Sequence, residues 1–499
     1  MSELEIKLHV EPGRRGGLLD APGRRKIRRS TLSAIYFDTS DLLLARHGFT
    51  LRLRNEDGRW VQTLERSQHR AAERMEHEVS VETSDAVVPT LDLERHRPSQ
   101  AGRHLRALLR RAKHPRLAES CRTEVTRLRR LLNAHGAEVE WALDEGRVSA
   151  AGRSRPICEL ELEFRRGDPA GLFALAHDWV ALHGLWIDPV SKSGRGTLLI
   201  EDRPFSPATK ASPAPLDGQQ ASTLGGQAML RRQVASCLEQ ILPNAAEIAW
   251  GSPDTGHVHQ LRVGLRRLRS VARGMKRFAT TLPDEWEPAV MPVFAALGEA
   301  RDQHALSASI APALQRAGAP VVDAPSSPAP AQALQDLVRG MAFQGALIRL
   351  LGFAQASSPD IDGAQDGSGL EYLTRRLRKL AHQVTRGARR FEELPFSDQH
   401  RVRKRLKRLR YLAEFAAPAF DSRDVKDWMK RVSRAQDELG RHIDVVRAGE
   451  RFAAMAPSDP GAWFAVGWLR AQQERSARAS RKSLEHLRRS TGFWVRTDA

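Results

Sequence analysis

Polar and apolar residues alternate along several short segments in the first part of the chain. The alternation is clearest in residues 50–54, 74–82, 139–144 and 157–164. A period of two predicts β-strands that have one polar and one apolar face. Short helices are predicted at 101–113 and 169–183. Together these patterns predict an α+β domain built on an antiparallel sheet.

The pattern changes beyond this first domain, which is placed at residues 1–203. Residues 204–226 are rich in Pro, Ala, Ser and Gly, and this composition predicts a linker. The apolar spacing that follows is helical nearly throughout, so residues 227–499 are predicted to form an all-α domain. Two further Pro- and Gly-rich segments, 318–332 and 357–369, are predicted to be surface loops.

The polar faces of the predicted strands carry charges of both signs. Residues of one parity are charged, and these are Glu3, Glu5 and Lys7; Arg52 and Arg54; Arg74, Glu76, Glu78 and Glu82; Glu140 and Asp144; Glu159, Glu161 and Glu163. Residues of the opposite parity are largely apolar. Rows of carboxylates on one strand face repel each other unless cations lie among them. A closed antiparallel barrel would gather all these faces around one lumen.

Such a lumen has the chemistry of a site for metal and phosphate. Hard divalent cations prefer oxygen ligands, and Mg²⁺ commonly combines a few carboxylates with phosphate oxygens. Arginines and lysines interleaved with the carboxylates suit the phosphates themselves. Strands whose polar side simply faces water are the alternative, but charges this consistent in placement favour the lumen.

The segment ELEIK at residues 3–7 matches the Glu-x-Glu-x-Lys signature of the CYTH superfamily, the triphosphate tunnel metalloenzymes. Later segments that resemble this family follow in its order, at 35–39, 51–54, 74–78, 122–127, 142–146, 157–164 and 191–196. The resemblance covers residues 1–203. It implies an eight-stranded antiparallel tunnel that hydrolyses inorganic triphosphate, or a related triphosphate, with Mg²⁺ or Mn²⁺.

The resemblance also implies roles for individual residues. The metal ligands would be Glu3, Glu5, Asp144, Glu159 and Glu161, with Glu163 as a further candidate. The residues that bind triphosphate would be Lys7, Arg52, Arg54, Arg74, Arg127 and Lys192. Glu3, Glu5 and Lys7 would be catalytic. Glu76 and Glu78 would hold a second metal or orient the basic residues.

One position departs from the family pattern. Related bacterial proteins usually have a lysine where this chain has Glu65. Arg66 follows directly, but adjacent strand residues face opposite ways, so Arg66 is not expected to replace that lysine. A negative charge in place of a positive one is expected to weaken triphosphate binding.

Two segments of the second half repeat one pattern, at 259–272 and 400–413. From the first His of each, basic residues fall at +3, +7 and +10, and apolar residues at +2, +6, +9 and +13. At 100° per residue these sets lie on opposite sides of a helix. This duplication predicts two similar helical bundles, 227–355 and 370–499, related by a pseudo-twofold axis.

The repeated pattern resembles the CHAD domain, a helical family named for its histidines and known for binding polyphosphate. The resemblance implies phosphate contacts from His259, Arg262, Arg266, Arg269, Arg273, His400, Arg403, Lys407 and Arg410, with Arg301 as a further candidate. Both repeats also contain Leu-Gly-x-x-x-Asp, which ends at Asp302 and Asp444. These two carboxylates are expected to orient basic neighbours. A solvated charged face is the alternative, but such faces usually mix signs.

Charge supports a polyanion as partner. The net charge is +19, and most of it lies in the second part: residues 1–205 hold 35 Lys and Arg against 30 Asp and Glu, whereas 206–499 hold 44 against 30. No apolar run reaches the length of a membrane span, and no signal peptide is visible. The scattered cysteines fit a reducing compartment. A cytoplasmic location is therefore predicted, with polyphosphate granules as a possible site of association.

Three functions remain open at this point. The first is an enzyme, an inorganic triphosphatase-like phosphohydrolase whose helical part binds polyphosphate. The second is a polyphosphate-targeting scaffold with a degenerate tunnel, of which Glu65 would be the mark. The third, a nucleic-acid binder, ranks last because the chain is 6% aromatic and its aligned basic positions include no stacking residue. Thiamine triphosphate, nucleotides and cyclase chemistry stay open, as does Mg²⁺ against Mn²⁺.

Overall fold

The computed structural model describes residues 2–20, 27–67, 73–82, 88–212, 223–320, 331–356 and 368–495. The chain divides into two compact units, and each is described by itself. The sheet unit comprises Met1–Lys210, Leu238–His257 and Gln335–Ala356. The helical unit comprises Ala211–Cys237, Val258–Leu334 and Ser357–Ala499. The predicted boundaries at 203 and 227 stay predictions.

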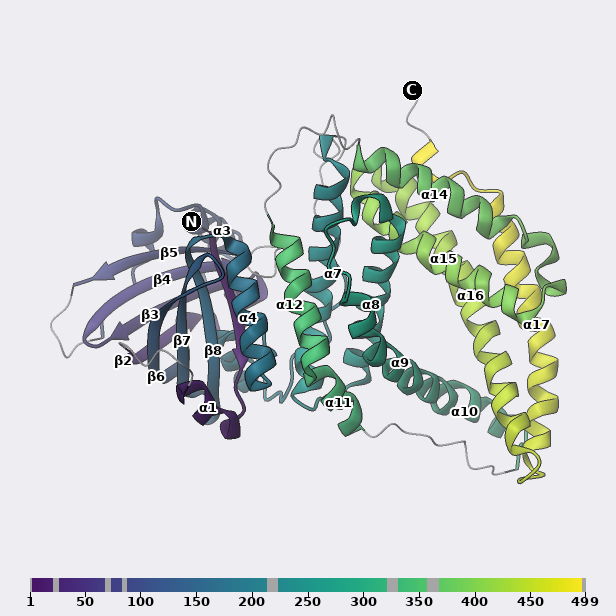
Figure 1. The fold of residues 1–499 in the computed structure, drawn as a ribbon, viewed down its shortest axis with the longest axis horizontal. Helices are drawn as coiled ribbons and strands as arrows, with labels where there is room; N and C mark the ends of the chain where they lie inside the picture. The colour runs from purple at the N-terminus through teal and green to yellow at the C-terminus, as the bar shows by residue number, and fades with distance from the viewer. Residues whose placement is uncertain are drawn as a thin grey trace. The chain divides into compact units, whose positions relative to one another are not determined.

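The sheet unit is built on nine antiparallel strands in the order β5-β4-β3-β2-β6-β7-β8-β1-β9 (Figure 1). Their bounds are β1 Ser2–His9, β2 Arg28–Asp38, β3 Phe49–Glu56, β4 Arg59–Ser67, β5 Glu73–Val81, β6 Ala118–Ala134, β7 Ala137–Ala150, β8 Arg153–Gly167 and β9 Trp186–Ile187. The four strongest alternating segments therefore lie in β3, β5, β7 and β8, as predicted.

The prediction of a closed eight-stranded tunnel needs correction. The sheet has nine strands, and its far ends meet only where the first residues of β1 pair with β5, at Ser2↔Met75, Glu3↔Arg74 and Leu4↔Glu73. The short strand β9 pairs with β1 farther along, at Leu8 and His9. The sheet is therefore curled, but it is not closed along its length. The first residues of β1 pair with β5, whereas its last residues, Leu8 and His9, pair with β9.

Helices cover the apolar face of the sheet. Leu105 and Leu109 of α3 (Gln100–Arg111) pack with Leu51 and Leu64 of β3 and β4. Helix α4 (Pro169–His183) lies along β7 and β8. Successive strand residues point to opposite faces of the sheet. Because the apolar residues face the helices, the charged residues that alternate with them face the concave side. The two helices predicted from sequence are α3 and α4.

Helix α5 (Lys192–Ile200) lies on the concave side of the sheet. Its Leu199 packs in an apolar cluster with Tyr36, Cys121 and Val148. Gly196 makes the close approach possible, because a Cβ there would lie 2.3 Å from Cys121 Sγ. The packing places Lys192, the first residue of α5, among the strand carboxylates.

Two helical segments also belong to the sheet unit. The first is the end of α7 (Gly226–Ala249) from Leu238 onward, and the second contains α12 (Met341–Gln355). In α12, Gln344 Oε1 accepts a hydrogen bond of 3.0 Å from the Ile187 backbone N–H of β9. These segments support the β9 end of the sheet.

The helical unit is α-helical, as predicted. Its main helices are α8 Thr255–Gly274, α9 Trp286–Ala305, α10 Ala311–Arg316, α14 Gly369–Thr385, α15 Phe396–Ala416, α16 Ser422–Met455 and α17 Ala462–Arg488. Helix α11 spans Ala331–Arg339. The short helices α1 (Arg15–Asp20) and α2 (Leu43–Arg46) belong to the sheet unit. The two repeated segments lie in α8 and α15. Residues 213–222, 321–330 and 357–367 of the predicted linker and loops lie outside the described residues.

Two reciprocal ion pairs join α9 and α16 in the helical unit. Arg301 of α9 donates to both carboxylate oxygens of Asp444, at 3.0 and 2.9 Å. Arg447 of α16 donates to Asp302 at 2.7 Å. Asp302 and Asp444 thus hold basic neighbours, as the sequence predicted.

Among the helices that the structure describes, none is by itself long and apolar enough to cross a membrane. The pair Gln332–Arg339 and Met341–Gln355, bent by 46° at its break, meets the length and composition only when taken together.

Candidate functional site

The concave face of the sheet contains a cavity of about 210 Å³. Each of the strands β1–β8, together with α5, contributes to its lining. The lining residues are Glu5, Leu32, Ala34, Tyr36, Arg52, Arg54, Glu56, Glu65, Glu76, Glu78, Thr123, Val125, Arg127, Arg129, Glu140, Asp144, Glu161, Glu163, Arg165 and Lys192. Nine of the charged strand residues singled out in the sequence therefore line one cavity.

Three carboxylates of this region form a compact triad. One oxygen each of Asp144, Glu159 and Glu161 lies within 4.8 Å of the others. Asp144 and Glu159 are directly opposite in the β7–β8 register, and Glu161 lies two residues farther along the same face. Asp144 and Glu159 are almost fully buried. The triad therefore follows from strand register alone.

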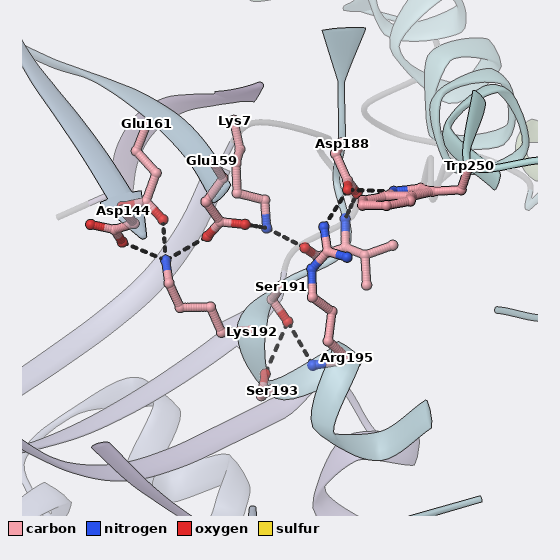
Figure 2. A network of polar contacts seen from close by, with 12 residues as sticks. Lys7, Asp144, Glu159, Glu161, Asp188, Ser191, Lys192, Ser193, Arg195 and Trp250 are labelled. Atoms are coloured by element: carbon pink, nitrogen blue, oxygen red, sulfur yellow. Dashed lines mark hydrogen bonds and ion pairs between the residues drawn. The ribbon is translucent and has the colours of Figure 1, made fainter. Parts of the chain in front are cut away.

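Two basic side chains, Lys192 and Arg127, neutralise the triad, and Figure 2 shows the contacts of Lys192. Lys192 Nζ lies 2.7 Å from Asp144 Oδ2, 2.5 Å from Glu159 Oε1 and 2.8 Å from Glu161 Oε1. Arg127 donates through Nε and Nη2 to the two oxygens of Asp144, at 2.6 Å each, and also pairs with Glu161. Ser191 caps α5 by accepting from the Gly194 N–H at 3.0 Å, which fixes the helix start at Lys192.

The buried charges stabilise one another. Burial by itself would lower the pKa of Lys192, but the three carboxylates raise it well above its usual range. Burial acts in the opposite direction on Glu161, and Lys192 and Arg127 nevertheless hold its pKa well below the usual range. Both groups are therefore charged at neutral pH.

The triad fits a divalent cation. It offers oxygen donors from three carboxylates at short separation, which is the donor set that Mg²⁺ and Mn²⁺ prefer. The oxygens concerned belong to the carboxylates that contact the Lys192 ammonium. A cation bound by the triad would therefore compete with Lys192 for these oxygens.

The other predicted residues at the start of the chain differ in position. Glu5 lines the cavity. Glu3 and Arg74 are backbone partners across β1 and β5, and their side chains lie outside the described part of the structure. Lys7 is buried beside the cavity rather than in its lining: its Nζ donates to the Val190 carbonyl and lies 3.8 Å from Glu159 Oε2. Burial lowers the pKa of Lys7.

Glu65 points into the cavity, at the end that Arg52 and Arg54 line. Arg52 Nη2 lies 3.1 Å from Glu65 Oε1 and 3.3 Å from Glu76 Oε1. Burial opposes the charge of Arg52, but these carboxylates raise its pKa above the usual range. Arg54 pairs with Glu78 at 3.0 Å. Arg52 and Arg54, which were both predicted to bind triphosphate, are thus already paired with acids.

Arg66 does not replace the missing lysine. It lies on the opposite face of β4, over the Phe49 ring at 5.3 Å and against His104. The strand alternation predicted this orientation.

The helical unit contains a second charged site, a basic groove of about 350 Å³. Its lining residues are Arg262, Arg266, Arg269, Ser270, Arg273, Phe294, His400, Arg403, Lys404, Lys407, Arg408 and Arg447. Seven of the nine predicted phosphate contacts are among them. His259 and Arg410 are not part of this lining, and Arg410 instead donates to Glu414 at 2.9 Å and to Gln436 at 3.3 Å.

Phe294 and Arg447 are groove residues that the sequence pattern did not indicate. Phe294 lies beneath three guanidiniums, with its ring centroid 5.1 Å from Arg269 and 5.7 Å from both Arg262 and Arg266. These cation–π contacts support the arginines. Neither residue belongs to the repeated motif. Phe294 lies in α9 and Arg447 in α16, so the spacing of the basic residues in α8 and α15 could not indicate them.

Crowding reduces the positive charge of the groove. Burial, followed by the charges of Arg266, Arg403, Arg301 and Arg262, lowers the pKa of Lys407 to about 5. Burial and neighbouring cations also lower the pKa of His400 to about 4. At neutral pH both side chains are therefore largely uncharged in the free protein.

Comparison with known families identifies both parts of the chain. Residues 1–196 match the CYTH domain and residues 232–453 match the CHAD domain. The chain therefore consists of an N-terminal CYTH domain followed by a C-terminal CHAD domain. CYTH domains bind triphosphate substrates and CYTH enzymes use divalent metals, whereas CHAD domains are linked to polyphosphate.

Several solved structures are similar to parts of the chain. The CHAD domain from the plant Ricinus communis is 24% identical, covers 57% of this chain and 98% of its own, and has a TM-score of 0.46. A putative adenylyl cyclase from Hippeastrum, described as having a dominant triphosphatase activity, is 18% identical over 40% of this chain and 96% of its own, with a TM-score of 0.29. A putative adenylate cyclase from Bacillus halodurans is 17% identical over 36% and 88%, with a TM-score of 0.25.

The contacts of Lys192 lead to a prediction about metal affinity. Lys192→Met keeps the length of the side chain but removes the charge that competes for the triad. We expect the affinity for Mn²⁺, measured by titration calorimetry without triphosphate, to rise by about tenfold or more. The exposed Lys210→Met variant makes the same change in net charge and is expected to bind Mn²⁺ like the wild type. Equal affinities in both variants would show that the triad is not the cation site.

Proposed function

We propose that this protein is a metal-dependent phosphohydrolase that cleaves inorganic triphosphate, or a closely related triphosphate, in the cavity of its CYTH domain. One observation carries this proposal: eight strands and α5 line a single cavity whose lining includes Asp144 and Glu161 of the carboxylate triad together with several basic side chains. That combination suits a cation and a chain of phosphates at the same time.

In this proposal the triad and Glu5 hold Mg²⁺ or Mn²⁺, with Glu3 as a further ligand from the same strand. The bound ion would neutralise phosphate charge and position the attacking water. Arg52, Arg54, Arg127 and Lys192 orient the triphosphate, together with Arg74 as the family pattern implies. Lys7 acts through Glu159, which it approaches from outside the cavity. Positioning and electrostatics supply most of the rate enhancement.

The lining favours an inorganic substrate. Tyr36 is the one aromatic residue among the lining side chains that the structure describes, and it is almost fully buried. A base or a thiazolium ring would need an exposed aromatic or apolar surface. A chain of phosphates needs only the charged groups that are present.

Phosphate release from a panel of triphosphates tests the activity. With inorganic triphosphate and Mg²⁺ or Mn²⁺, we expect the wild type to turn over. Glu161→Gln should reduce this turnover by about 100-fold or more, because Glu161 is both a proposed metal ligand and a partner of Lys192. Glu119→Gln removes a carboxylate outside the cavity lining and should leave turnover unchanged. An inactive wild type under every metal would leave the protein as a polyphosphate-binding scaffold.

The ion pair of Arg52 with Glu65 is the observation that favours the scaffold as an alternative. Glu65→Lys would release Arg52 and add a positive charge to the cavity. We therefore expect KM for triphosphate to fall by about tenfold in Glu65→Lys, with a smaller fall in Glu65→Gln. Steady-state kinetics at fixed ionic strength measure both variants. If KM stays constant in both, the substrate does not reach Arg52.

For the CHAD domain we propose binding of polyphosphate in the basic groove. Support comes from five of the six repeated basic residues of α8 and α15, which line one groove together with Arg447. Nucleic acid is the weaker alternative, because Phe294 is engaged with three guanidiniums rather than free to stack on a base. Binding to polyphosphate and to RNA at matched salt separates these ligands.

The lowered pKa of Lys407 predicts proton uptake on binding. Lys407 is largely neutral at pH 7 in the free protein, and a bound polyanion favours its charged form. Binding should therefore take up about one proton, and affinity should weaken as pH rises from about 6 to 8. Calorimetry in two buffers of different ionisation enthalpy measures the uptake. Lys407→Arg should bind polyphosphate with clearly less uptake, whereas undiminished uptake would assign the proton to another group.

A further inference from the structure

We propose that Trp250, the residue directly after α7, is a positioning residue for the triphosphate site. It lies in the region that matches the CHAD family, but it belongs to the sheet unit. Its indole fixes Asp188, and Asp188 holds the backbone and the helix that carry Lys7 and Lys192 into place. The inference rests on the proposed triphosphatase function and concerns the same site.

Asp188 is the centre of this arrangement (Figure 2). Its carboxylate is fully buried and accepts hydrogen bonds from Trp250, from α5 and from its own loop. Trp250 Nε1 donates to Oδ2 at 2.8 Å, Arg195 donates to the same oxygen, and the Val190 N–H donates to Oδ1 at 3.0 Å. Burial acts to raise the pKa of Asp188, but Arg195, Lys7 and the indole hydrogen bond lower it overall. The carboxylate is therefore held as an anion.

From Asp188 the contacts lead to both basic residues near the triad. The Asp188 backbone N–H donates to the Lys7 carbonyl at 3.0 Å, and the Lys7 ammonium donates to the Val190 carbonyl. Arg195 belongs to α5, one turn after Lys192. Asp188 thus fixes the segment that leads into α5 and the first turn of the helix itself. Lys192 reaches the triad from the end of this braced segment.

The indole ring also closes this region against water. Trp250 packs against His9 at 4.2 Å and edge-on against Trp186 at 5.3 Å between centroids, with Arg195 5.1 Å from its ring. His9 is buried, and its pKa is lowered to about 4, so it adds no charge beside Arg195 at neutral pH. The Asp188–Arg195 pair is therefore enclosed by neutral rings.

Loss of the indole N–H would leave a buried carboxylate with one donor fewer. Such a group is costly unless the surrounding segment moves to compensate. Movement of residues 188–192 shifts Lys192 relative to the triad, and contacts as short as those of Lys192 tolerate displacements of only about 0.5 Å. A residue outside the CYTH match would thus determine how firmly the CYTH site is assembled.

Trp250→Phe in the full chain tests this role, because it removes the N–H donor and keeps a ring. We expect kcat/KM for triphosphate to fall by about tenfold. We also expect Mn²⁺ affinity without triphosphate to rise, as in Lys192→Met but less, because a loosened Lys192 competes less well for the triad. A double variant with Lys192→Met should bind Mn²⁺ no more tightly than Lys192→Met alone.

Trp179→Phe is the matched control. Trp179 is a buried indole of α4 in the same unit, and it packs against Trp141 and His183 rather than Asp188. The kcat/KM for triphosphate and the Mn²⁺ affinity of Trp179→Phe should both stay within about twofold of the wild type. Asp188→Asn keeps the shape of the carboxylate and should change both readouts in the same direction as Trp250→Phe, which provides the test if that variant folds poorly.

The outcomes separate this inference from the proposed function. If the wild type has no triphosphatase activity, the proposed function is overturned. The Mn²⁺ affinities of the variants then still test whether Trp250 positions Lys192. The inference alone is overturned if the wild type is active but Trp250→Phe and Asp188→Asn have the same kcat/KM and the same Mn²⁺ affinity as Trp179→Phe. A rise in Mn²⁺ affinity that is additive with Lys192→Met also overturns it, because Trp250 would then act independently of Lys192.

Discussion

Mutual neutralisation of buried charges is the constraint on which the cavity depends. Asp144 and Glu159 are almost fully removed from water, and Lys192 and Arg127 contact the triad directly. Loss of one partner from such a set typically costs about 3–5 kcal/mol, because the other charge is left buried alone. The positions of β6, β7, β8 and α5 are therefore tied together by electrostatics as much as by apolar packing.

The two charged sites of the chain differ in how their charges are balanced. The cavity balances acids against bases, so it can accept a cation together with an anionic substrate. The basic groove has almost only one sign of charge, and it limits its own repulsion by keeping Lys407 and His400 largely neutral at neutral pH. A polyanion that enters the groove supplies the missing negative charge. The reciprocal pairs of Arg301 and Arg447 with aspartates hold the supporting helices in register.

The boundaries of sequence families and of compact units do not coincide in this protein. Helix α7 begins in the helical unit and ends in the sheet unit, and α12 also belongs to the sheet unit. The Pro- and Gly-rich composition of residues 204–226 indicated a linker, but composition does not report which later helices return to the sheet. Trp250 and Gln344 are the consequence, since both bond to the β9 region from the CHAD part of the chain.

The sequence by itself determined which residues share a face. Strand alternation placed Glu5, Arg52 and Glu161 on the strand faces that line one cavity, and helical spacing placed Arg262 and Arg403 on the helix faces that line one groove. These periodicities are local, so they survive without knowledge of the fold. Tertiary structure alone decided that β9 makes a ninth strand, that Lys7 lies beside the cavity, and that Asp188, Trp250 and Phe294 support the sites. Such contacts join loops and helices far apart in the chain, where no repeating pattern relates one residue to the other.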